Sequence, residues 1–178
     1  MTILITGGAG LVGSHCAEYF ARAGRKVILL DNLSRSKIFS SKRKSVEHNW
    51  KFLSQMKNVV LVKGDIRDSR RLGAVFSEYI PDAVIHTASQ PGVKASLADP
   101  HADFMINALG TVNVLEALRG VNPRGTFVYC STNKVYGDNV NGLGVRRRSG
   151  RYAFRSRAGV DEAVSIDQSG HTPYGVSK

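Results

Sequence analysis

Residues 2–13 read TILITGGAGLVG, and this stretch decides the fold of the 178-residue chain. The first five residues are β-branched or apolar, which is typical of a buried strand. Glycines follow at positions 7, 8, 10 and 13, and from Leu11 the apolar residues adopt helical spacing. A strand that turns through glycines into a helix directs free backbone N–H groups and the positive end of the helix dipole at one spot. The stretch therefore predicts a binding site for a pyrophosphate.

A second expected strand, residues 26–30, supports a dinucleotide site because it ends at an acid. That acid, Asp31, follows Gly7 by 24 residues, which is where a carboxylate accepts hydrogen bonds from a ribose diol. A tight turn without a ligand would explain the glycines but not the acid. Arg35 follows closely, and it either stacks on an adenine or pairs with a 2′-phosphate. Because Asp31 would repel that phosphate, the sequence favours NAD over NADP.

Alternating strand and helix patterns predict an α/β fold with a doubly wound parallel sheet, the Rossmann arrangement. Asp99 and Pro100 mark the start of one helix, as an N-cap followed by a proline in the first turn. We expect the whole chain, residues 1–178, to be one dinucleotide-binding domain. Further strands are expected at 59–63, 83–86 and 126–130, and helices at 45–56, 69–79 and 100–120.

Polar residues near the expected strand ends are candidate site residues. We predict that Asp65 meets the exocyclic amine of the adenine while Ile66 covers the ring, although a turn would also explain the acid. Asp68 is expected only to cap the following helix. His86 ends the fourth strand, where it is either catalytic or, as we favour, packed and hydrogen-bonded. Asn107 bonds either to the strand behind the site or to its local neighbours.

The net charge of +11 is concentrated in two basic clusters. Six arginines lie within 146–157, and a second cluster of basic residues lies within 35–44. Basic clusters bind nucleic acid in some proteins, but more often they are solvated or meet the phosphates of a nucleotide ligand. We therefore predict no nucleic-acid partner. Residues 138–171, which contain the first cluster, show little periodicity and are expected to form an irregular active-site loop.

The composition argues against a membrane span, a signal peptide and a metal site, and it indicates the cellular compartment. No apolar run approaches the ~20 residues that a membrane span needs, so no membrane partner is expected. The N-terminus has no cationic start before its apolar run, which argues against a signal peptide. Cys16 and Cys130 lie far apart without metal-ligand spacing, so we predict no metal site and a reducing compartment, the cytoplasm.

Two segments carry groups suited to proton transfer. STNKVYG at 131–137 leaves the fifth strand on the same edge as the glycine turn, and TPYGVSK occupies 172–178. The threonine and proline of the second segment start a helix, so Tyr174 and Lys178 share one face at i, i+4. A lysine ammonium beside a phenol stabilises the phenolate and lowers its pKa. With Thr132 orienting the substrate oxygen, the set predicts proton transfer from a secondary alcohol beside a nicotinamide.

These motifs together resemble the extended short-chain dehydrogenases/reductases, the sugar-nucleotide epimerase/dehydratase family. The motifs are TGGAGLVGSH, DNLSR, GDIRD, HTASQP, STNKVYGD and YGVSK. The resemblance implies NAD as cofactor, a nucleotide sugar as substrate, a homodimer for the full-length protein, and Thr132, Tyr174 and Lys178 as catalytic triad. The cofactor contacts that it predicts are Gly7, Gly10, Leu11, Val12, Gly13, Asp31, Asn32, Ser34, Arg35, Asp65, Ile66, Ala88, Asn107, Tyr174 and Lys178.

Within the family, STNKVYGD at 131–138 is most similar to the branch that epimerises CDP-paratose at C2. The leading hypothesis is therefore NAD-dependent epimerisation of a nucleotide sugar through a keto intermediate. The alternatives are a UDP-sugar 4-epimerase, a 4,6-dehydratase, or a non-catalytic dinucleotide-binding fragment. A dehydratase usually has an Asp-Glu pair where this chain has Asn133 and Lys134. Because the family pattern continues past Lys178, we expect the Rossmann domain to be truncated before a C-terminal substrate domain.

Overall fold

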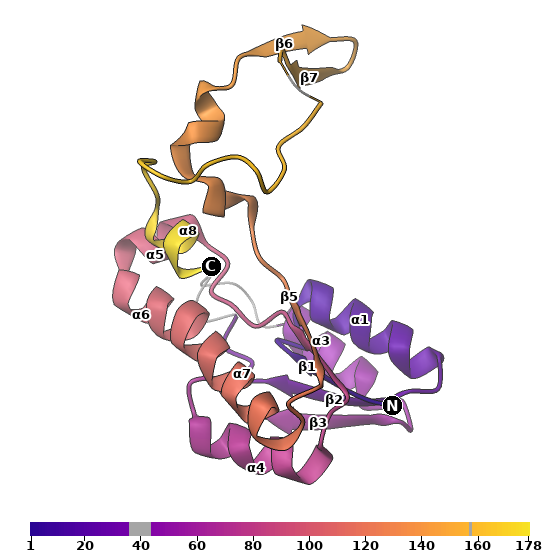
Figure 1. The fold of residues 1–178 in the computed structure, drawn as a ribbon. Coiled ribbons are helices and arrows are strands. Elements are labelled where there is room, and N and C mark those ends of the chain that lie inside the picture. Colours follow the sequence, from indigo (N-terminus) through magenta and orange to yellow (C-terminus); the bar gives the residue numbers. More distant parts are fainter. Residues whose placement is uncertain (36–43, 157) are drawn as a thin grey trace.

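The computed structural model describes residues 1–35, 44–156 and 158–178. A five-stranded sheet in the order β3-β2-β1-β4-β5 forms its centre, and every neighbouring pair is parallel (Figure 1). This arrangement confirms the predicted doubly wound parallel sheet. The strands are β1 (Thr2–Thr6), β2 (Lys26–Asp31), β3 (Val59–Lys63), β4 (Ala83–His86) and β5 (Thr126–Tyr129).

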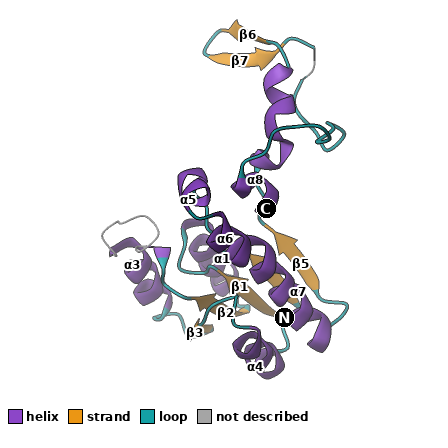
Figure 2. Cartoon of the chain, turned by 90° about the vertical axis from the view of Figure 1, so that its left-hand side faces the viewer, coloured by secondary structure: helices purple, strands orange, loops and turns teal. Residues whose placement is uncertain are grey.

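Helices cover both faces of the sheet, as Figure 2 shows from the side. Helices α1 (Leu11–Arg22) and α3 (Lys44–Leu53) pack on one face, and α4 (Ser69–Tyr79) and α7 (Gly110–Val121) on the other. Because alternate residues of a strand point to opposite faces, each layer has a buried core of its own. The first core holds Ile3, Ile5, Ala17, Ala21, Val27, Leu29 and Leu53. The second holds Leu4, Ile28, Leu30, Val62, Ile66, Leu72, Val75, Phe76, Val84, Val114 and Leu118.

The helical region before α7 differs from the single helix expected at 100–120. A short helix α5 (Val93–Ala98) comes first, and α6 (Pro100–Phe104) then leads into α7 through a π-helical turn, η1 (Met105–Leu109). In that turn the N–H of Gly110 donates to the carbonyl five residues earlier. Asp99 caps α6 as predicted, because its carboxylate accepts the N–H three residues on at 2.9 Å. The π turn changes the face that the following residues present.

The expectation of an irregular loop over 138–171 is wrong in part. An interrupted 3₁₀ segment, η2 (Asn133–Gly142), is followed by a hairpin of β6 (Val145–Arg148) and β7 (Arg151–Phe154). The hairpin is a separate two-stranded sheet that projects away from the central one (Figure 1). Gly150, the second central residue of its two-residue turn, has φ of +75°, a conformation that glycine adopts readily. The strands are short and arginine-rich, which is why their pattern is weak in the sequence. The chain then enters α8 (Pro173–Ser177).

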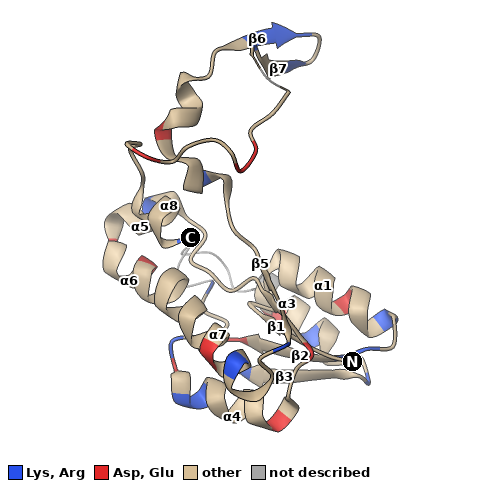
Figure 3. Ribbon diagram, in the orientation of Figure 1, with Lys and Arg blue, Asp and Glu red and all other residues tan. Residues whose placement is uncertain are grey.

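The basic residues of the hairpin are exposed, and Figure 3 shows them at the far end of the projection. They are Arg146, Arg147, Arg148 and Arg151. Part of each predicted basic cluster, namely Lys37, Lys42, Arg43 and Arg157, lies outside the described residues. Several element boundaries also differ slightly from expectation: β2 ends at Asp31, α3 runs from Lys44 to Leu53, β5 ends at Tyr129, and α7 ends at Val121. Within the described ranges, no helix is long and apolar enough to cross a bilayer.

Candidate dinucleotide and catalytic site

A pocket of about 370 Å³ lies at the carboxyl ends of the parallel strands, the edge where doubly wound sheets bind their ligands. Each of the five strands contributes its end or the residues after it, and α8 closes one side. The lining residues are Gly7, Gly10, Leu11, Val12, Leu30, Asp31, Asn32, Ser34, Arg35, Val46, Gly64, Asp65, Ile66, Thr87, Ala88, Ser89, Pro91, Ile106, Cys130, Ser131, Tyr174 and Lys178.

The glycine turn forms a cradle that has no room for side chains. Gly7 has φ of +64°, and a Cβ there would lie 2.6 Å from the backbone nitrogen of Ala88. A Cβ on Gly13 would lie 2.5 Å from the carbonyl oxygen of Gly7, so this glycine lets α1 pack against the turn. The N–H groups at the start of α1 have no partner within the helix, and Leu11 and Val12 line the pocket there. The turn therefore fits a pyrophosphate.

Asp31 is tied to the glycine turn at the end of β2. Its carboxylate accepts the N–H of Ala9 at 2.9 Å and the N–H of Leu33 at 2.7 Å. Burial raises the pKa of Asp31, and these hydrogen bonds and the charge of Arg35 partly oppose that rise. From α3, Asn49 donates to the carbonyl of Ala9 at 3.0 Å. The acid and the turn thus form one unit at the pocket, which is the arrangement that the sequence predicts.

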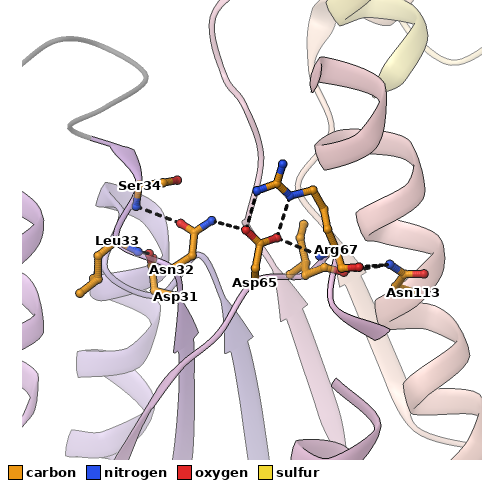
Figure 4. A network of polar contacts seen from close by, with 8 residues as sticks. Asp31, Asn32, Leu33, Ser34, Asp65, Arg67 and Asn113 are labelled. Atoms are coloured by element: carbon orange, nitrogen blue, oxygen red, sulfur yellow. Dashed lines mark hydrogen bonds and ion pairs between the residues drawn. The ribbon is translucent and has the colours of Figure 1, made fainter. Parts of the chain in front are cut away.

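Asp65 is the centre of a second polar network, drawn in Figure 4. Its carboxylate accepts from Asn32 at 2.9 Å and from Arg67 at 3.0 and 2.8 Å. The Arg67 side chain holds the pKa of Asp65 down at about 2. Asn113 on α7 donates to the carbonyl of Ile66 at 3.0 Å, which fixes the loop after β3. Asp65 and Ile66 line the pocket where an adenine is predicted, but the contact with its amine stays a prediction.

The start of α8 brings Tyr174 and Lys178 to the pocket. Thr172 caps this helix as predicted, because its hydroxyl accepts the N–H of Gly175 at 3.1 Å. The ammonium of Lys178 lies 4.5 Å from the ring centre of Tyr129, whose hydroxyl donates to the Lys178 carbonyl at 3.1 Å. Burial lowers the pKa of Lys178. Tyr129, which sequence reasoning missed, is thus a direct neighbour of the candidate lysine.

Thr132 is the third candidate of the catalytic set. The structure describes it, but it is not among the residues that line the pocket. Its hydroxyl accepts the N–H of Lys134 at 3.3 Å and caps η2 instead. The preceding residue, Ser131, lines the pocket. Thr132 has an extended backbone, and successive side chains of an extended chain point to opposite sides. The role of Thr132 in orienting the substrate oxygen therefore stays a prediction, and Ser131 is the neighbouring residue that lines the pocket.

The His86 side chain is packed in the interior and hydrogen-bonded, which is the arrangement of a structural residue. The side chain is fully buried, with Nδ1 2.7 Å from the Thr6 hydroxyl and Nε2 3.1 Å from the Thr111 hydroxyl. Its ring stacks near those of Phe127 and Tyr129 at 5.7 and 5.8 Å between centres. Burial lowers the pKa of His86 to about 4. The imidazole is therefore neutral near pH 7 and joins β1, β4, β5 and α7.

Asn107 lies behind the site rather than in the pocket lining. Its side-chain oxygen accepts the N–H of Gln90, in the loop after β4, at 2.8 Å. Gly13 likewise acts by close packing and does not line the pocket. Asp103, Gln90 and Ser177 surround Asn107 and were missed by sequence reasoning. No local signal in the sequence marks Asp103, because its partner Ser177 lies 74 residues further along the chain.

Comparison with known proteins identifies relatives over the whole chain. Residues 3–178 match the family described as the NAD dependent epimerase/dehydratase family, whose description names the predicted cofactor. The chain is 38% identical to CDP-paratose 2-epimerase of Salmonella typhi over 179 residues, which cover 100% of this chain and 50% of that protein. It is 32% identical over 140 residues to UDP-glucose 4-epimerase of Klebsiella pneumoniae, covering 78% of this chain and 94% of that protein.

Solved structures give the same relationship. The UDP-glucose 4-epimerase of Thermus thermophilus, in complex with NAD, has a TM-score of 0.69 and 33% identity, covering 100% of this chain and 47% of that one. The UDP-Glc/GlcNAc 4-epimerase of Campylobacter jejuni has a TM-score of 0.75 and 26% identity, covering 99% of this chain and 45% of that one. The chain thus spans about half the length of the Salmonella protein and of both solved chains.

Proposed function

Because the chain belongs to the NAD dependent epimerase/dehydratase family, we propose that it is the cofactor-binding part of an epimerase that inverts C2 of CDP-paratose. The observation that carries this proposal is the composition of one pocket. The glycine turn and Asp31 lie in its lining together with Tyr174 and Lys178. The similarity to CDP-paratose 2-epimerase extends over the whole chain, and it supports the choice of sugar nucleotide.

Each part of an NAD molecule has matching residues in the pocket. Gly7 and Gly10 leave room for the pyrophosphate, and Asp31 lies at the strand end where a carboxylate holds the adenine ribose. Asp65 and Ile66 provide an acceptor and an apolar surface for the adenine. Further lining residues that we assign to the cofactor are Leu11, Val12, Asn32, Ser34, Arg35 and Ala88. When bound, NAD supplies a hydride acceptor that can later act as hydride donor.

The chain's own contribution to the reaction is proton transfer. We assign Tyr174 as the base whose phenolate accepts the proton of the sugar hydroxyl as the carbon–oxygen double bond forms. The phenol returns that proton to oxygen when the carbon is reduced on its other face. Lys178 stabilises the phenolate through its positive charge. Either Ser131, which lines the pocket, or Thr132 orients the reacting oxygen, and Ser131→Ala and Thr132→Val distinguish the two.

A second candidate reaction is 4-epimerisation of a UDP-sugar. The Klebsiella relative and both solved relatives are named as 4-epimerases. The two candidates share the fold, the cofactor and the proton-transfer pair, so the choice of substrate separates them. A panel of CDP-paratose, CDP-tyvelose, UDP-glucose and UDP-galactose assigns the reaction.

The experiment that tests the proposal is the substitution Tyr174→Phe in the full-length protein. We expect interconversion of CDP-paratose and CDP-tyvelose to fall by ~10²–10⁴-fold, the usual contribution of a positioned proton acceptor. NAD affinity should stay unchanged because the ring remains. Turnover that is indifferent to Tyr174→Phe refutes the assignment of the base. No turnover of any of the four nucleotide sugars supports a dinucleotide-binding protein without catalytic activity. Residues 1–178 alone are expected to bind NAD but to turn over little, because half of the Salmonella enzyme has no counterpart in them.

A further inference from the structure

Four polar side chains form a buried cluster behind α8. Each is at most 5% exposed, and each comes from a different segment: the loop after β4, α6, η1 and α8. Burying a polar group costs free energy unless it is hydrogen-bonded, and every member of this cluster has a partner within it. The members are Gln90, Asp103, Asn107 and Ser177.

Asp103 is the common acceptor of the cluster. One carboxylate oxygen accepts the hydroxyl of Ser177 at 2.5 Å. The other accepts the amide of Gln90 at 3.0 Å and the amide of Asn107 at 3.2 Å. All three neighbours donate, and an ionised carboxylate is the side chain that only accepts. Hydrogen bonds to a charged acceptor are shorter and stronger than neutral ones, so Asp103 holds these groups in fixed positions.

Ser177 connects this cluster to the candidate proton-transfer pair. It lies one helical turn after Tyr174 and directly before Lys178 in a five-residue helix. So short a helix has no stability of its own in water, and its orientation depends on contacts with its surroundings. The bond from Ser177 to Asp103 faces the interior, so it fixes the rotation of α8 about its axis. That rotation decides where the side chains of Tyr174 and Lys178 point.

The same cluster also holds the pocket wall. Asn107 accepts the N–H of Gln90 at 2.8 Å and donates to Ser177 at 3.0 Å. The loop that contains Gln90 lines the pocket at Ala88 and Ser89. One set of hydrogen bonds therefore joins α8 to the segment against which a cofactor would lie. A displacement of either part relative to the other has to break a buried hydrogen bond.

The charge of Asp103 adds an electrostatic contribution at Lys178. Burial lowers the pKa of this lysine, and the negative charge of Asp103 opposes that effect. Cys130 opposes the effect of burial as well, so Asn at position 103 would remove only the part that Asp103 contributes, together with one of the two acceptor oxygens of the cluster. Asp103 therefore acts on the lysine both through α8 and through space.

We propose that Asp103 is a positioning residue, which acts through Ser177 to orient Tyr174 and Lys178 against the dinucleotide pocket. The proposal rests on the function assigned above to those two side chains. Asp103 itself does not line the pocket, so its substitution should change the reaction step more than the binding of cofactor or substrate.

The test compares Asp103→Asn, Ser177→Ala and the double variant with Asp99→Asn as control. Asp99 is an exposed acid that caps α6, the helix that also contains Asp103. Asp99→Asn therefore makes the same change from acid to amide away from the cluster. In the full-length protein we expect each single variant to lower kcat by ~10–10²-fold, the effect of a misplacement of about 1 Å. KM and NAD affinity should stay within about twofold, and the double variant should be about as slow as the single ones, because the two residues act as one unit.

A second readout uses residues 1–178 and needs no turnover. Hydrogen exchange of the backbone amides in 172–178, followed by mass spectrometry, should be faster in Asp103→Asn and Ser177→Ala but not in Asp99→Asn. Ser177→Ala removes a single oxygen, so it keeps the test decisive if Asp103→Asn does not fold.

Three results overturn the proposal. The first is an unchanged kcat in a folded Ser177→Ala enzyme, and the second is an equal loss of kcat and NAD affinity, which indicates general damage. The third is unchanged exchange over 172–178 in both single variants. The proposed function fails in a different way, through an unaltered enzyme that shows no epimerisation or through indifference to Tyr174→Phe. In that case the exchange experiment alone decides whether Asp103 orients α8.

Discussion

The substitution Gly7→Ala tests the glycine cradle at its most crowded point. Gly7 has φ of +64°, and an added Cβ would lie 2.6 Å from the backbone nitrogen and 2.7 Å from the Cα of Ala88. Both neighbours are backbone atoms, so no side-chain rotation relieves the contact. The new methyl group must push the turn after β1 and the loop after β4 apart, and both of these segments line the pocket.

The free-energy cost of Gly7→Ala has two parts. A left-handed backbone costs an L-residue ~1–2 kcal/mol, and inserting a methyl group into a packed site costs ~1–3 kcal/mol more. The total of about 2–5 kcal/mol lowers the melting temperature by about 2–4 °C per kcal/mol in a chain of this size. Gly24→Ala isolates the first part, because Gly24 has φ of +74° but no neighbour within 4 Å of an added Cβ. Gly73→Ala, in α4 with open space around it, should instead stabilise by ~0.5–1 kcal/mol.

Thermal unfolding followed by circular dichroism, together with titration of NAD, measures these effects. We expect the melting temperatures to rank Gly73→Ala above the unaltered chain, then Gly24→Ala, then Gly7→Ala. NAD binding should be lost only in Gly7→Ala. If Gly7→Ala were as stable as Gly24→Ala and bound NAD as tightly as the unaltered chain, the close contact between Gly7 and Ala88 would not limit the site.

Two further predictions concern charged groups. Asp31→Ala should weaken NAD binding by ~1.5–3 kcal/mol, the value of a hydrogen bond to a charged group, and should erode the preference over NADP; equal affinities for both dinucleotides in the unaltered chain would contradict this. His86 has a pKa of about 4 when folded and 6.5 when unfolded, so the unfolded chain binds a proton more readily. The contribution of neutral His86 to the free energy of unfolding is therefore complete above pH 6.5 and is lost as the pH falls toward 4. The loss amounts to about 3 kcal/mol, and urea unfolding between pH 4 and 6.5 should show a flatter pH dependence in His86→Gln.

The elements that follow from local chemistry could be predicted from the sequence. The β-branched run before Gly7 and the acid at Asp31 specify a strand, a turn and a second strand through neighbouring residues alone. The Thr172 cap likewise depends on residues within one helical turn. These features place the pocket, because parallel strands deliver their ends to one edge, and the Thr172 cap starts the helix that carries Tyr174.

The features that the sequence concealed depend on contacts between distant segments. Asp103 meets Ser177 across 74 residues, so no local pattern shows that the acid is buried. The π turn before Gly110 is a small change in winding that leaves the apolar spacing nearly intact. Thr132 and Ser131 both carry a hydroxyl, and the sequence alone does not show that Ser131 lines the pocket while Thr132 caps η2.

In the proposed reaction, epimerisation proceeds by oxidation and reduction at one carbon, and Tyr174 transfers only the hydroxyl proton. A proton on the Tyr174 oxygen exchanges with water, whereas a carbon-bound hydrogen that moves as hydride does not. The most direct measurement is therefore mass spectrometry of CDP-tyvelose formed in ordinary water by the full-length protein from CDP-paratose carrying deuterium at C2. We expect the product to retain deuterium at C2, and replacement of that deuterium by hydrogen from water would rule out the proposed hydride transfer.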